Sequence, residues 1–154
     1  MSKQSLIFFL LIFSVLYHCA CSDKDIANNL NGSLKSHSAC KKNTEVFSSN
    51  EIISKIVYEF NKETNILSLN HINVPFNCCP DSLGTEFSFV KDTFLIKEYE
   101  VNGNCRCTCF YDLDMIITGV EEKKYTIQIT EPYQIFFDID LEYNPKGSFI
   151  HTIE

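Results

Sequence analysis

The sequence of 154 residues contains no tryptophan, and its basic residues are a single arginine, Arg106, and twelve lysines. Twenty acidic residues leave a formal net charge of −7. Binding to the phosphates of nucleic acid requires clustered Lys and Arg side chains, so we expect no nucleic-acid partner. Thirteen Phe and seven Tyr residues can fill a core in place of tryptophan.

The chain also lacks an apolar run long enough to cross a bilayer. Its longest such run, residues 6–17, has twelve residues, whereas a transmembrane helix needs about 20. Lys3 precedes this run and "HCACSD" follows it, which is the pattern of a secretory signal peptide. We therefore predict a signal peptide at residues 1–20 and an exported, soluble remainder.

Two cysteines close to this run indicate a lipoprotein signal. Cys21 follows the small Ala20, and "CSDKD" resembles the Ser-plus-acidic stretch behind the lipidated cysteine of surface-exported lipoproteins of Bacteroidota. We predict acylation (palmitate among the chains) at Cys21, with Cys19 as the alternative. Several acyl chains would hold the protein stably on the outer membrane, at the cell surface. An ordinary cleaved signal peptide, giving a periplasmic or secreted protein, is the competing interpretation.

Residues 21–50 are rich in Ser, Asn and Lys and show no apolar period. Such a segment buries too little apolar surface to offset the entropy of ordering, so we expect a polar tether. Cys40 is the exception, and we expect it to fasten the end of the tether to the domain. The domain itself is predicted to cover residues 51–154.

From Ile52 onward the apolar residues alternate with polar ones, which is typical of half-buried strands. The pattern predicts an all-β domain of seven or eight short strands. The segments that carry it are 55–60, 66–71, 86–90, 93–99, 104–117, 125–129 and 134–143. A helix over 51–60 is the one alternative, because "SSNEIISKIVYEF" also has a capping box and helical spacing.

An all-β domain of this size is most simply a two-sheet sandwich. "ITGVEEKKYTIQI" resembles the corner of immunoglobulin-like and fibronectin type III sandwiches, in which a tyrosine opens a strand after a turn. Residue by residue, Val120 takes the apolar position and Tyr125 takes the corner position. The resemblance implies that the Tyr125 hydroxyl bonds to nearby backbone, although the turn lacks the usual proline.

"NCRCTCFYDLDMI" places three cysteines at every second position, in one row with Tyr111, Leu113 and Met115. This alternation predicts that the thiols face the core. Exported cysteines are usually paired, and residues two apart on a strand are poorly placed to bond to each other. Each of Cys105, Cys107 and Cys109 should therefore pair with one of three partners, which leaves six arrangements open. The partners are Cys40, Cys78 and Cys79.

A zinc site is the alternative for part of this set. Four Cys or His ligands around one ion are usual, and His71, Cys78, Cys79 and Cys107 could supply them if "NCCP" folds over the strand. No Cys-x-x-Cys motif is present, so we expect no thiol catalysis. His71 aligns with Leu67 and Leu69, which favours a hydrogen-bonded histidine in the core or at a sheet edge.

Two rows of carboxylates on outward strand faces suggest a second alternative function. They could bind calcium or serve glycoside hydrolysis if they met in a cleft. The rows are Asp112 with Asp114, and Asp138 with Asp140 and Glu142. A solvated strand surface explains them as well, and the chain has neither a Gly-rich phosphate loop nor a nucleophile elbow. We predict no catalytic residues and no cofactor.

Three segments together resemble a group of small cysteine-rich secreted or lipid-anchored proteins of Bacteroidota. The shared pattern is a Cys-Lys pair at "SACK", an H-x-N-x-x-F-N-C-C stretch at "HINVPFNCC" and a C-x-C-x-C-x-Y-D-L strand at "CRCTCFYDL". The resemblance implies an exported, stapled scaffold and transfers no activity. We expect a non-enzymatic binding or structural module that contacts a protein or glycan ligand through loops such as 77–82, since loops on rigid scaffolds carry function.

Overall fold

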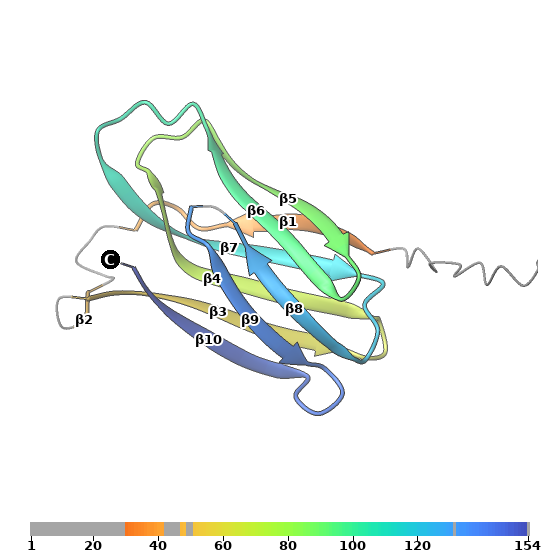
Figure 1. Ribbon diagram of the computed structural model, residues 1–154. Coiled ribbons are helices and arrows are strands. Elements are labelled where there is room, and N and C mark those ends of the chain that lie inside the picture. The colour runs from red at the N-terminus through yellow and green to blue at the C-terminus, as the bar shows by residue number, and fades with distance from the viewer. Residues whose placement is uncertain (1–29, 42–46, 49–50, 131, 154) are drawn as a thin grey trace, which may run out of the picture.

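The computed structural model describes residues 30–41, 47–48, 51–130 and 132–153. These residues form ten strands in two sheets that pack face to face (Figure 1). The prediction of an all-β, disulfide-stapled two-sheet sandwich is confirmed, with more strands than expected. The predicted signal peptide, Cys19 and Cys21 lie outside the described residues. In the part of the chain described here, no helix has the length and hydropathy needed to cross a membrane.

The larger sheet has the strand order β1-β7-β4-β3-β10, and β2 pairs with the outer part of β3. Its strands are β1 (Asn31–His37), β2 (Phe47–Ser48), β3 (Glu51–Asn61), β4 (Ile66–Asn77), β7 (Thr108–Thr118) and β10 (Lys146–Ile153). The smaller sheet has the order β5-β6-β8-β9. Its strands are β5 (Ser82–Val90), β6 (Thr93–Val101), β8 (Lys124–Ile129) and β9 (Ile135–Asp140). β6 and β8 run parallel because β7 crosses to the other sheet between them.

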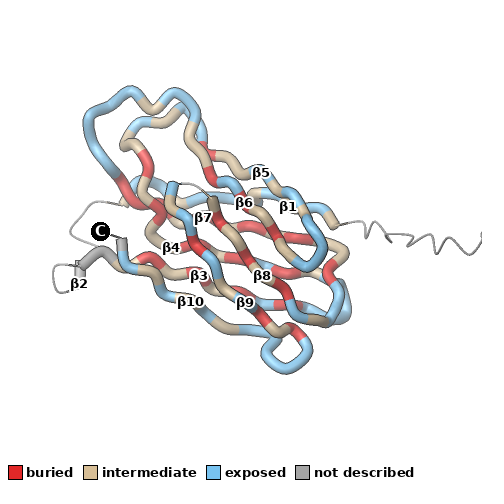
Figure 2. Tube along the Cα trace, viewed as in Figure 1, coloured by how far each residue is buried: buried red, intermediate tan, exposed pale blue. Residues whose placement is uncertain are grey.

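The core lies between the sheets and follows the period-two pattern of the sequence. Along β7, Leu113, Met115 and Ile117 are buried, and their neighbours at 112, 114, 116 and 118 point outward. Figure 2 shows the buried segments along the facing strands of both sheets. Burying one such side chain stabilises the fold by about 1.5–3 kcal/mol, so this alternation carries most of the stability.

Residues 51–60 form a strand, which settles the one ambiguity of secondary structure. β3 pairs with β4 on one side and β10 on the other. Ile56, Tyr58 and Phe60 are buried on its inner face. The helical spacing in this segment does not produce a helix, because two neighbouring strands satisfy the backbone hydrogen bonds of β3.

The prediction of a tether across 21–50 is wrong for residues 31–41. β1 pairs with β7, with Leu34 opposite Met115, and a register shift separates Leu34 from Ser36. A further bridge joins Lys41 to Phe110. β1 is a sheet-edge strand whose side chains are mostly exposed, so it needs few apolar residues, and its sequence resembles that of a linker. The sandwich therefore begins before residue 51.

β4 is longer than predicted, since it continues through Pro75 to Asn77 and does not leave the sheet at His71. A register shift between His71 and Val74 accommodates the change, with Asn73 at a φ of 63°, a conformation that Asn tolerates better than most residues. β4 pairs with β3 only as far as Ile72. Beyond that residue it is an edge strand on this side, where proline is tolerated.

The C-terminal strands also differ from the expected pattern. β9 ends at Asp140, and Tyr143, which the alternation places in the inner row, is 72% exposed. A turn at 141–143 breaks the alternation and leads to β10, a strand that the sequence pattern did not predict. Its pairing with β3 completes the larger sheet.

The corner resemblance describes the β7–β8 connection well. Val120 and Tyr125 are both buried, and the Tyr125 hydroxyl accepts a hydrogen bond of 3.1 Å from the backbone N–H of Glu121. The ring of Tyr125 stacks on Phe94 with centroids 4.4 Å apart. Burial raises the pKa of Tyr125, so the hydroxyl stays protonated and neutral in the core at physiological pH.

We expect Tyr125→Phe to lower the free energy of unfolding by about 1 kcal/mol, because the Glu121 N–H loses its acceptor. Tyr143→Phe is the matched control, since the Tyr143 side chain is exposed, and it should change stability by less than about 0.5 kcal/mol. Urea unfolding followed by tyrosine fluorescence measures both. Equal effects of the two substitutions would show that the corner bond does not stabilise the fold.

Candidate functional site

Three disulfides join the six predicted cysteines. Cys40 bonds to Cys109, Cys78 to Cys107 and Cys79 to Cys105. Their Cα–Cα distances are 5.4, 5.6 and 5.9 Å, within the usual range for disulfides. Each member of the 105–107–109 triplet has a partner outside the triplet, in agreement with the geometric argument from sequence.

The prediction that all three cysteines of this triplet face the core is correct for one of them. Cys109 lies in β7 and is buried, whereas Cys105 and Cys107 precede the strand and are exposed. β7 begins at Thr108, because the chain before it crosses from the smaller sheet and cannot join the ladder. Local alternation therefore does not predict where the strand starts.

The bridges gather at one end of the sandwich, which we call the stapled end: residues 38–41, 77–81 and 102–109. Both loops there cross between the sheets, 78–81 from β4 to β5 and 102–107 from β6 to β7. Figure 1 shows these two loops side by side above the strands. Two disulfides tie the loops to each other, and the third ties the segment after β1 to the start of β7.

Asn77 is the centre of the hydrogen bonds at the stapled end. Its side-chain oxygen accepts bonds from the backbone N–H groups of Cys79 and Cys105, at 3.1 and 3.2 Å, and its side-chain nitrogen donates to the Cys105 carbonyl at 2.5 Å. Its backbone N–H donates to Glu100 at 2.5 Å. One side chain therefore holds both crossover loops in register.

Tyr111 also forms a hydrogen bond with Asn77. The Tyr111 hydroxyl donates to the Asn77 carbonyl at 3.1 Å. Burial, with a smaller contribution from the negative charge of Glu100, raises the pKa of Tyr111. The hydroxyl is therefore protonated at neutral pH and available as a donor.

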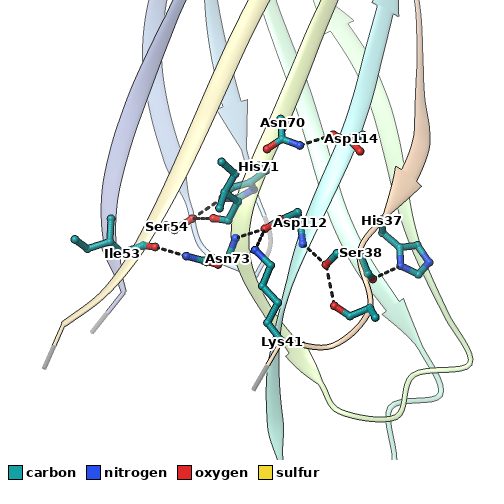
Figure 3. A network of polar contacts seen from close by, with 12 residues as sticks. His37, Ser38, Lys41, Ile53, Ser54, Asn70, His71, Asn73, Asp112 and Asp114 are labelled. Carbon is teal, nitrogen blue, oxygen red and sulfur yellow. Dashed lines mark hydrogen bonds and ion pairs between the residues drawn. The ribbon is translucent and has the colours of Figure 1, made fainter. Parts of the chain in front are cut away.

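A second cluster of hydrogen-bonded polar side chains lies at the register shift in β4. Asp112 accepts bonds from the Lys41 ammonium at 2.5 Å and from the Asn73 backbone N–H at 3.1 Å, and the Asn73 amide donates to the Ile53 carbonyl at 2.9 Å. Figure 3 shows Lys41 and Asn73 converging on Asp112 from different strands and loops. These contacts join the Cys-Lys pair, the H-x-N stretch and the Y-D-L strand, the three segments of the pattern noted in the sequence.

His71 lies in the core between a serine and a glutamate. Its Nε2 is 2.8 Å from the Ser54 Oγ, and its Nδ1 is 2.8 and 2.9 Å from the two Glu98 carboxylate oxygens. Ser54 belongs to β3 and His71 to β4, whereas Glu98 comes from β6 in the other sheet. Figure 3 shows Ser54 and His71 facing each other.

The order of serine, histidine and carboxylate matches the geometry of a hydrolytic triad. The three side chains are, however, 2%, 2% and 0% exposed, and the Ser54 hydroxyl also lies 3.1 Å from the Ile72 carbonyl oxygen, in position to donate to it. A nucleophile needs a path for its substrate and a proton directed at its base. We therefore interpret this trio as a structural link between the two sheets.

The structure does not assemble the alternative zinc site. Cys78, Cys79 and Cys107 are in disulfides, which removes the thiolates that zinc requires, and both ring nitrogens of His71 already have partners. Among the described residues no group of three or more His, Cys, Asp or Glu side chains is placed to hold a metal ion.

The two carboxylate rows do not converge. Asp112 and Asp114 lie on the outer face of the larger sheet, and Asp138 and Asp140 lie on the outer face of the smaller one. Each of these four has a partner on its own sheet or beside it, such as Thr126 for Asp138 at 2.7 Å. Glu142 follows β9 in a turn. The rows therefore cannot act together on one substrate.

A groove of about 510 Å³ opens at the stapled end. Its lining combines apolar, aromatic and acidic side chains, and none of the described residues that line it is basic. Phe76, Asn77, Glu98, Glu100, Thr108 and Tyr133 are among the lining residues. Glu98, which is itself fully buried, is the carboxylate that binds His71, so the groove lies next to the link between the sheets.

Glu98, Glu100 and Ser54 were missed by the reasoning from sequence. One signal was present: in "TFLIKEY", Glu98 falls in the same inward row as Phe94 and Ile96. An acidic residue in an apolar row is rarely buried without a partner, so it could have been paired with the inward His71.

Comparison with protein-family models, curated proteins and solved structures found no match.

Proposed function

We propose that this chain is an exported, lipid-anchored, non-enzymatic module that binds a partner in the groove of its stapled end. The observation that supports this most directly is the placement of all three disulfides at the stapled end, which contributes Asn77, Cys107 and Thr108 to the groove. Bridges at that position reduce the freedom of the loops, and preorganised loops bind with a smaller entropic penalty. A groove of 510 Å³ also lies in the usual size range of ligand sites.

The lining of the groove narrows the class of ligand. Glu100 accepts the Asn77 N–H with one oxygen, and within the described residues it forms no ion pair with Lys, Arg or His. A net charge of −7 adds to the negative potential. Anionic ligands are therefore disfavoured. Neutral hydroxyl-rich glycans and protein segments without acidic side chains fit this chemistry.

Binding can be tested with the mature oxidised protein on a glycan array and on a peptide array of varied charge. Tyr133→Ala and Thr108→Lys alter the groove wall, and Asp138→Asn, on the outer face of the smaller sheet, is the control. We expect either groove variant to weaken binding of any hit at least about tenfold, the effect of losing roughly 1.4 kcal/mol. Equal binding by groove variants and wild type would place the contact surface elsewhere.

The proposed anchor has its own experiment. Cells that express the full chain are labelled with an alkyne fatty acid, and the protein is compared with its Cys21→Ser and Cys19→Ser variants. We expect Cys21→Ser to lose the label and to leave the membrane fraction, whereas Cys19→Ser keeps both. Loss of label in Cys19→Ser alone would move the site to Cys19. A protein that is unlabelled in every form would be a secreted or periplasmic protein.

A further inference from the structure

The three disulfides differ in their access to solvent. Cys40 and Cys107 are exposed, but their partners Cys109 and Cys78 are 6% exposed and half-buried, whereas Cys79 and Cys105 are both exposed. Among the disulfides described, Cys79–Cys105 is therefore the pair in which both residues are exposed. Thiol–disulfide exchange requires an attacking thiolate to approach one of the sulfurs, so access controls which bridge opens.

We propose that Cys79–Cys105 is a site of reversible thiol–disulfide exchange and that its co-reactant is a dithiol. One thiolate of the dithiol attacks the Cys105 sulfur, the Cys79–Cys105 bond breaks, and Cys79 leaves as a thiolate that takes a proton from water. The second thiol then attacks the mixed disulfide and releases Cys105. The dithiol loses two electrons and two protons, and the protein gains two thiols.

Asn77 keeps the two cysteines together when the bond is open. Its three bonds to Cys79 and Cys105 use backbone N–H and carbonyl groups and do not involve the sulfurs. The Cys79 sulfur also lies 3.4 Å from the Asn77 side-chain oxygen, so the thiol of the reduced protein has an acceptor in place. The reduced pair therefore stays close enough to be reoxidised.

The neighbouring bridges prevent a general unfolding. Cys78–Cys107 joins the same two loops, and the Cys78 N–H donates to the Cys107 carbonyl at 3.2 Å. Cys40–Cys109 holds the start of β7. Opening of the exposed bridge frees only the tip of the 102–106 loop, which precedes the groove residue Cys107.

Arg106 makes the site selective for anionic attack. It is the one arginine of the chain, it is exposed next to Cys105, and no described residue forms an ion pair with it. A fixed positive charge beside a disulfide attracts an incoming thiolate. Lys91, which is exposed in the turn between β5 and β6, serves as the control cation.

The order of reduction tests the proposal directly. The oxidised protein is treated with increasing dithiothreitol, quenched with iodoacetamide and digested with trypsin, which cleaves after Arg106 and so separates Cys105 from Cys107 and Cys109. We expect Cys79 and Cys105 to be alkylated at about tenfold less reductant than Cys40 and Cys109, with an unchanged circular dichroism spectrum. Earlier opening of another bridge, or opening of all three in one step with loss of structure, would overturn it.

The charge contribution is measured with two small thiols, anionic mercaptoethanesulfonate and cationic cysteamine. Arg106→Gln should slow reduction by the anionic thiol by about two- to fivefold and leave the cationic thiol unchanged or faster, as expected for one partly screened charge. Lys91→Gln should change neither rate. Equal slowing by both thiols in Arg106→Gln, or the same selectivity in Lys91→Gln, would contradict the role of Arg106.

Discussion

Replacement of His71 by leucine is expected to lower the free energy of unfolding by about 3–5 kcal/mol, the usual effect of removing one partner of a buried, hydrogen-bonded acid–base pair. His71 provides the hydrogen bonds that hold both oxygens of Glu98, and Glu98 has no solvent exposure. Without His71, the Glu98 carboxyl group loses the one side-chain partner that it has among the described residues. Urea unfolding at pH 7 measures the loss.

A double variant separates this explanation from a simple packing defect. His71→Leu/Glu98→Leu removes both polar groups, and replacing a whole buried pair by apolar residues is often close to neutral. We therefore expect the double variant to recover more than half of the stability lost by His71→Leu. Glu86→Gln is the control for loss of a carboxylate, because Glu86 is exposed on β5. If the double variant were less stable than His71→Leu, the trio would not be an isolated link.

Removal of the Cys40–Cys109 bridge is expected to have the second large effect, about 4 kcal/mol. These residues are 69 positions apart, and the chain entropy that a bridge removes from the unfolded state grows with the loop that it closes. Cys40→Ala/Cys109→Ala also loosens the start of β7, where Cys109 pairs with Phe76 of β4 in the larger sheet. Thermal unfolding should show a clearly lower midpoint.

The matched comparison is Cys79→Ala/Cys105→Ala. Cys78–Cys107 closes nearly the same loop, so the second bridge adds a short ring and about 2 kcal/mol. Intact mass before and after alkylation confirms that the remaining bridges have formed in each variant. A loss from Cys79→Ala/Cys105→Ala equal to or greater than that from Cys40→Ala/Cys109→Ala would show that strain or local contacts, and not loop entropy, control stability here.

The strands of the sandwich could not all be predicted equally well from the sequence. The inward faces of β3, β7 and β8 could be predicted residue by residue, because side-chain direction on a strand has a period of two and needs no knowledge of the partner. β1 could not, since an edge strand with exposed side chains has the composition of a linker. Its place beside β7 follows from backbone pairing, which leaves little trace in side-chain type.

The cysteines show the same limit. Strand geometry was sufficient to predict that Cys105, Cys107 and Cys109 bond outside their own triplet. It could not choose among six arrangements, because that choice depends on where the loops 78–81 and 102–107 cross between the sheets. The crossing also ends the inward row at Cys109 and leaves Cys105 exposed.

Period-two alternation and cysteine number are local properties, and they were enough to establish an all-β, stapled sandwich with an inward His71. The partners of that histidine, the pairing of the bridges and the groove above them depend on contacts between residues far apart in the chain. Glu98 follows His71 by 27 positions and reaches it from the opposite sheet. Such contacts form only when the two sheets pack, because packing excludes the water that would otherwise solvate each group separately.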